Sequence, residues 1–79
     1  MNKVWLVELL EEGDTHGTLM RICSSYDKAK DYIEKQYDSY RAYHKITEMK
    51  MHHSDYCDKF TWHADGEEIS YFISCEPVL

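Results

Sequence analysis

Residues 57–75 read CDKFTWHADGEEISYFISC, and this stretch decides the fold. Asp65-Gly66 is a preferred pair for a two-residue type I′ turn, and the flanking segments are rich in large apolar side chains. The stretch therefore predicts a hairpin between strands at about Cys57–Ala64 and Glu67–Cys75. The turn sets these facing pairs: Ala64 with Glu67, Trp62 with Ile69, Phe60 with Tyr71, Thr61 with Ser70, and Lys59 with Phe72. Turn chemistry and hydrophobic pattern agree on this register.

The first half of the chain predicts two more strands and one helix. Lys3–Leu10 and Thr18–Cys23 are rich in β-branched and large apolar residues, and residues 11–17 between them supply turn chemistry. Ser24-Ser25 offers a helix N-cap, and apolar residues then recur at helical spacing. We expect a helix from about Tyr26 to about Tyr40.

A third strand is predicted at Ile46–Met51, so the expected element order is ββαβββ within one domain spanning residues 1–79. A crossover through the helix favours an α+β fold with an antiparallel sheet in the order 2-1-3-4-5 and the helix on one face. The predicted core consists of Trp5, Val7, Leu9, Met20, Ile22, Ala29, Tyr32, Ile33, Met49, Met51, Phe60, Trp62, Ile69, Tyr71 and Ile73.

One helix can cover only one face of such a sheet, so the opposite face is a candidate binding surface. Leu6 and Phe72 are the contact residues expected there. The face is predicted to collect Val4, Leu6, Leu19, Ile46 and Phe72 among Arg21, Glu48, Lys50, Lys59 and Thr61. Open apolar patches often mark association surfaces, and a homodimer through this face is one expectation. The alternative is that lysine and arginine stems shield the apolar residues.

Charge and composition restrict the class of function. The chain has 79 residues, with 15 Asp and Glu against 9 Lys and Arg, for a net charge of −6. This balance argues against direct binding of nucleic acid through phosphate neutralisation. Residues 1–10 are too short and too charged for a signal peptide or membrane span, and three cysteines without CxxC spacing are typical of a reducing compartment. We therefore expect a cytoplasmic protein.

The densest cluster of reactive side chains is formed by His52, His53, Cys57 and His63. Cys57 and His63, if both lie in one strand, are about 20 Å apart, which is too far for a shared zinc ion. His52 and His53 also point to opposite faces if they lie in a strand. No metal, cofactor or catalytic residue is therefore assigned, and a small Cys/His metal-binding or hydrolytic protein is kept as an alternative.

Acidic residues gather in two loops and form the second candidate binding surface. The acidic binding residues are Glu11, Glu12 and Asp14 in one loop, and Asp65, Glu67 and Glu68 in the other. Tyr43, predicted to follow the helix, is the expected exposed aromatic anchor. Such a surface favours a basic or nucleic-acid-handling protein as partner. An acidic mimic of nucleic acid is a further alternative.

The run Val4-Trp5-Leu6-Val7, the hairpin and the segment 25–33 (SYDKAKDYI) resemble an arrangement found in small uncharacterised proteins of bacteria and their phages. The resemblance covers about the first half of the chain and carries over no catalytic residue. It implies a protein that binds and disables host machinery, as anti-CRISPR proteins and other host-takeover inhibitors do. The leading hypothesis is thus a non-enzymatic, acidic protein-binding module.

Overall fold

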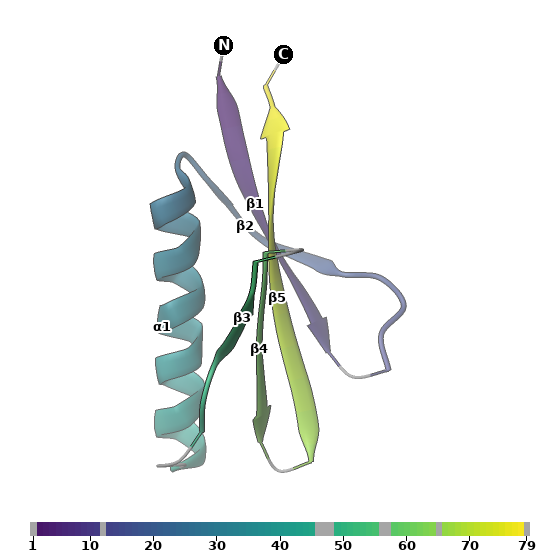
Figure 1. Ribbon diagram of the computed structural model, residues 1–79, viewed down its shortest axis with the longest axis vertical. Coiled ribbons are helices and arrows are strands. Elements are labelled where there is room, and N and C mark those ends of the chain that lie inside the picture. Colours follow the sequence, from purple (N-terminus) through teal and green to yellow (C-terminus); the bar gives the residue numbers. More distant parts are fainter. Residues whose placement is uncertain (1, 12, 46–48, 56–57, 65, 79) are drawn as a thin grey trace.

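The computed structural model describes residues 2–11, 13–45, 49–55, 58–64 and 66–78. One helix lies against one face of a twisted antiparallel sheet, and the chain ends lie side by side (Figure 1). The elements are β1 (Lys3–Glu11), β2 (Thr18–Cys23), α1 (Tyr26–His44), β3 (His52–Ser54), β4 (Lys59–Ala64) and β5 (Glu67–Pro77). The α+β class, the ββαβββ order and the antiparallel sheet are confirmed.

The strand order is 2-1-5-4-3, so the predicted order 2-1-3-4-5 is wrong. β5 is 11 residues long and pairs with β1 over nine positions, from Lys3 opposite Pro77 to Glu11 opposite Ile69. β3 has only three residues and lies at the sheet edge. The predicted third strand at 46–51 is also wrong in position, because β3 begins at His52 and residues 46–48 lie outside the described part. A long strand with apolar side chains on both faces is placed in the middle, where both faces are partly buried.

The β4–β5 register is the predicted one, with Trp62 opposite Ile69 and Phe60 opposite Tyr71. Gly66 has φ +79°, a left-handed conformation that a type I′ turn requires, whereas Asp65 lies outside the described residues. β4 begins at Lys59, and Cys57 also lies outside the described residues. The hairpin prediction is confirmed for the pairs that the structure describes.

The β1–β2 pair contains an irregularity between Val7 and Glu8 that changes which β2 side chains meet the helix. Trp5 pairs with Cys23 and Val7 pairs with Arg21, so Cys23 and Arg21 share the face of Val7. The prediction that Ile22 is in the core is therefore wrong, and so is the placement of Arg21 on the open face. Met20, predicted in the core, is 40% exposed and Ile22 is 59% exposed. A shift of one residue moves a whole strand's side chains to the other face.

The helix begins as predicted and ends later than predicted. Ser25 caps it by accepting a hydrogen bond from the Lys28 N–H at 3.2 Å. It ends at His44 rather than Tyr40, and Lys45 follows with φ 55°. Ala29 and Ile33 are fully buried against the sheet. The buried core consists of Val7, Cys23, Ala29, Ile33, Met49, Phe60, Trp62, Ile69, Tyr71 and Ile73, with Trp5, Leu9, Tyr26, Tyr32, Tyr37, Tyr40 and Met51 packed partly against it.

A search of the described residues finds no helix that is both long enough and apolar enough to cross a membrane.

Candidate functional site

A groove lies between the last turns of α1 and the end of the sheet where β1 finishes and β5 begins. Its volume is about 350 Å³. We call it the aromatic–acidic groove, and its lining residues are Leu9, Glu11, Gln36, Ser39, Tyr40, Tyr43, His44, Trp62, Glu67, Ile69 and Tyr71. The groove combines aromatic rings with two carboxylates, and the part of the chain that the structure describes contributes no lysine or arginine to it.

A series of ring contacts leads from the solvent into the core along this groove. Tyr43 is 83% exposed, and its ring lies 5.1 Å from that of His44. His44 stacks on Tyr40 at 4.2 Å, and Tyr40 meets the edge of Trp62 at 6.0 Å. Trp62 in turn stacks on Tyr71 at 5.4 Å. The deeper rings are packed in the core, so the groove has a buried aromatic base, and the exposed Tyr43 and His44 rings lie at its mouth.

Two carboxylates line the groove, one from each of the neighbouring strands β1 and β5. Glu11 ends β1 and Glu67 begins β5, and the pairing of Glu11 with Ile69 brings these ends together. A smaller adjoining hollow is lined by Glu11, Glu67, Glu68 and Ile69. Burial raises the pKa of Tyr71 to about 12, with further contributions from Tyr32 and the negative charge of Glu11. The lining of the groove among the described residues is therefore negatively charged.

The structure brings only part of the predicted binding set together. Glu11, Tyr43 and Glu67 line the groove. Glu68 lies beside the groove, and its Oε1 is 3.4 Å from His63 Nε2. Tyr43 is exposed as predicted, but it belongs to the last turn of α1 rather than to the connection after it. The Asp14 carboxylate accepts a hydrogen bond from the Glu11 N–H at 3.1 Å, which orders the loop. Glu12 and Asp65 lie outside the described residues.

Leu6 and Phe72 lie on the opposite face of the sheet, because Leu6 pairs with Ser74 and Phe72 with Glu8. Figure 1 shows that α1 covers only the other face. The Lys59 ammonium lies 6.0 Å from the centre of the Phe72 ring, which agrees with the alternative that charged side chains partly shield this face. Leu19 and Ile22 are nevertheless 52% and 59% exposed. Ile46 and Glu48, also predicted for this face, lie outside the described residues. The open face thus forms a separate surface from the groove.

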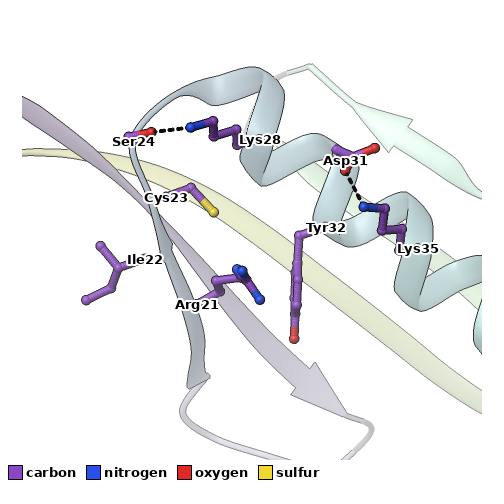
Figure 2. A pocket seen from close by; sticks show the side chains of 8 residues that line it. All are labelled: Arg21, Ile22, Cys23, Ser24, Lys28, Asp31, Tyr32 and Lys35. Carbon is purple, nitrogen blue, oxygen red and sulfur yellow. Dashed lines mark hydrogen bonds and ion pairs between the residues drawn. The ribbon is translucent and has the colours of Figure 1, made fainter.

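A second hollow, of about 440 Å³, lies between β2 and the first half of α1 (Figure 2). We call it the basic hollow, and its lining residues are Arg21, Ile22, Cys23, Ser24, Lys28, Asp31, Tyr32 and Lys35. The Arg21 guanidinium lies over the Tyr32 ring at 5.3 Å, and Lys28 Nζ donates to Ser24 Oγ at 3.0 Å. Lys35 Nζ pairs with the Asp31 carboxylate at 3.0 Å. The lining of the basic hollow, near the start of α1, therefore has a net positive charge.

His53 is held at the sheet edge by neighbouring groups. Its ring stacks on Phe60 at 4.1 Å, and its Nε2 lies 2.9 Å from Asp58 Oδ1. Tyr26 donates its hydroxyl to the same oxygen at 2.9 Å, and burial followed by this contact raises the pKa of Tyr26 to about 12. His52 pairs with Thr61 and so lies on the other face of the strand. Within the described ranges, which omit Cys57, no group of three metal-ligating side chains is found.

Sequence reasoning missed Tyr40 and His44 in the groove and Arg21, Lys28 and Lys35 in the basic hollow. The four-residue spacing of Tyr40 and His44 would have placed them on one side of a longer helix. Lys28 and Lys35 are seven residues apart and share a helix face in the same way. Arg21 carried no such signal, because its side depends on the irregularity in the β1–β2 pair.

Comparison of the chain with protein-family models, curated proteins and solved structures gave no significant match. The function is therefore inferred from the arrangement of the residues themselves.

Proposed function

We propose that the protein is a non-enzymatic binding module that receives a basic side chain of a partner protein in the aromatic–acidic groove. The observation that carries the proposal is the position of Tyr43, which is 83% exposed at the mouth of a groove that Glu11 and Glu67 also line. A large exposed aromatic side chain beside two carboxylates matches the chemistry of an arginine or lysine side chain.

The groove offers both interactions that such a cation uses. The exposed face of an aromatic ring attracts a cation by about 0.5–1 kcal/mol. The two carboxylates add charge-assisted hydrogen bonds in a cavity that is partly shielded from water. Trp62 forms the buried base of the groove and is only 1% exposed, so the contacts available to a partner are those of Tyr43 and the two carboxylates. A basic side chain of a partner protein can use both kinds of contact.

The charge of the whole chain supports a basic partner, because a net charge of −6 accelerates the encounter with a positively charged protein. The free thiols of Cys23 and Cys75 support an interaction in the cytoplasm. The resemblance of the first half of the chain to phage and bacterial proteins supports a host protein as the target, with inhibition as the consequence of binding.

Trp62 provides a direct measurement of groove binding. The chain has two tryptophans, so Trp5→Phe leaves Trp62 as the sole indole reporter. In this background, N-acetylarginine amide should change Trp62 fluorescence saturably at millimolar concentration, whereas the uncharged citrulline analogue should not. Glu67→Gln and Tyr43→Ala should each weaken binding about twofold to tenfold. Glu34→Gln, on an exposed residue outside the groove, is the matched control.

A photo-crosslinking amino acid at position 43 then tests for a protein partner. It should capture one protein through a basic segment, and the same group at Asp38, an exposed α1 position outside the groove, should not capture it. An equal arginine response in Glu67→Gln and the Trp5→Phe parent, or the same capture from positions 43 and 38, would contradict the proposal.

The open face is a second candidate contact surface. The exposure of Leu19 and Ile22 beside Leu6 on β1 favours it. We propose a second copy of the chain as its occupant, since a small sheet covered on one face gains by burying the other.

A further inference from the structure

The basic hollow holds cations that are not matched by carboxylates. Lys35 is paired with Asp31, but Lys28 contacts the neutral Ser24 hydroxyl and Arg21 contacts the Tyr32 ring. Among the described residues, neither Arg21 nor Lys28 forms an ion pair. Two positive charges beside the same hollow are thus left without a local counter-charge.

This concentration is unusual for so acidic a chain. The hollow takes three of the nine Lys and Arg residues and only one of the 15 Asp and Glu residues. Three cations against one carboxylate leave the lining of the hollow with a net positive charge, which a bound anion would offset. Among the hollows that the described residues form, this one has a lining with net positive charge and so favours an anion.

The two sides of the hollow offer complementary donors. Figure 2 shows Arg21 extending from β2 and Lys28 and Lys35 extending from α1. A guanidinium presents a planar pair of N–H donors that suits phosphate oxygens, and lysines add mobile point charges. Ser24 adds a hydroxyl, and the N-terminal end of α1 nearby favours negative charge.

We propose that the basic hollow binds the phosphate group of a small phosphate monoester. A dianion gains more than a monovalent carboxylate does from several cationic side chains that line one hollow. The volume of about 440 Å³ exceeds what phosphate alone fills and lies in the range of small-molecule sites, which leaves room for an organic group beside Tyr32. This site is separate from the aromatic–acidic groove and does not depend on the function proposed for it.

The test is a titration of the full chain followed by amide chemical shifts in nuclear magnetic resonance. The probes are glycerol 3-phosphate, inorganic phosphate and acetate, each added at constant ionic strength set with chloride. Glycerol 3-phosphate should produce saturable shifts confined to the end of β2 and the first turns of α1. Phosphate should act at the same residues with equal or lower affinity, and acetate should bind about tenfold more weakly.

Variants of exposed residues assign the effect without disturbing the core. Arg21→Gln should lower the affinity for glycerol 3-phosphate about fivefold or more, and Arg21→Lys should restore only part of it. Lys50→Gln removes one positive charge at an exposed residue outside the hollow and should leave the affinity unchanged. The proposal is overturned by non-saturable shifts spread over all lysines, by acetate binding as tightly as the ester, or by equal losses in Arg21→Gln and Lys50→Gln.

Discussion

The two faces of the sheet are built from the same strands and differ in what covers them. Under α1, Val7, Phe60 and Trp62 are at most 1% exposed, whereas Leu19 and Ile22 on the open face are more than half exposed. Apolar residue type alone therefore does not define the core of this protein. The single helix covers the largest buried side chains, whereas on the opposite face Thr61 and Ser70 are also buried and their hydroxyls lie 3.1 Å apart.

The largest difference in stability between the two faces is expected when one aromatic residue on each face is replaced by alanine. Trp62→Ala should cost about 3–5 kcal/mol of unfolding free energy, because it leaves a cavity among packed rings. Phe72→Ala, on the partly exposed open face, should cost about 1 kcal/mol. Urea denaturation of both variants and the wild type measures the contrast. Equal losses would mean that the open face is as well packed as the covered one.

The comparison also shows how much of the fold was accessible from the sequence. Local signals were sufficient for the β4–β5 register and for the helix start at Ser25, since a turn pair and a capping residue determine them. The strand order was predicted wrongly, because it depends on which strand can bury both faces and not on local turn or capping signals. The sequence does carry one signal for a central β5, the apolar residues of both parities around Tyr71-Phe72-Ile73.

The wrongly predicted strand order also explains why the candidate site was not predicted as one site. Glu11, Glu67 and Tyr43 were each predicted as binding residues, but the expected strand order separated β1 from β5 by two strands. Their meeting in one groove follows from the β1–β5 pairing, which joins residues more than 50 positions apart in the chain. Arg21 entered the basic hollow through the β1–β2 irregularity, a feature that depends on tertiary pairing and not on local sequence.

At alkaline pH the covered face is expected to lose stability, because Tyr26 and Tyr71 both pack on that side of the sheet. Each has a pKa raised from 10.0 to about 12 in the folded protein, mainly by burial. The folded state thus keeps a proton that the unfolded chain loses, so this stability is complete below pH 10 and is lost as the pH rises through 12. Urea denaturation between pH 10 and 12 should show that the free energy of unfolding declines as the pH rises.

The control for the alkaline effect is removal of each hydroxyl. Tyr71→Phe and Tyr26→Phe should each flatten the decline between pH 10 and 12, and the double variant should flatten it further. A decline of the same slope in the double variant would show that other groups, such as lysines, cause it.

A change in stability as small as that of Phe72→Ala, about 1 kcal/mol, is expected for Leu6→Lys on the open face, where Leu6 is only partly buried. Its effect on association should be larger: if two copies meet through this face, a lysine buried in the interface lacks a partner and the dimer dissociates. Sedimentation equilibrium should then give a dimer for the wild type and a monomer for Leu6→Lys. Thr15→Lys adds the same charge in an exposed loop and should remain dimeric. A monomeric mass for the wild type would contradict the dimer and leave Leu19 and Ile22 as solvated side chains.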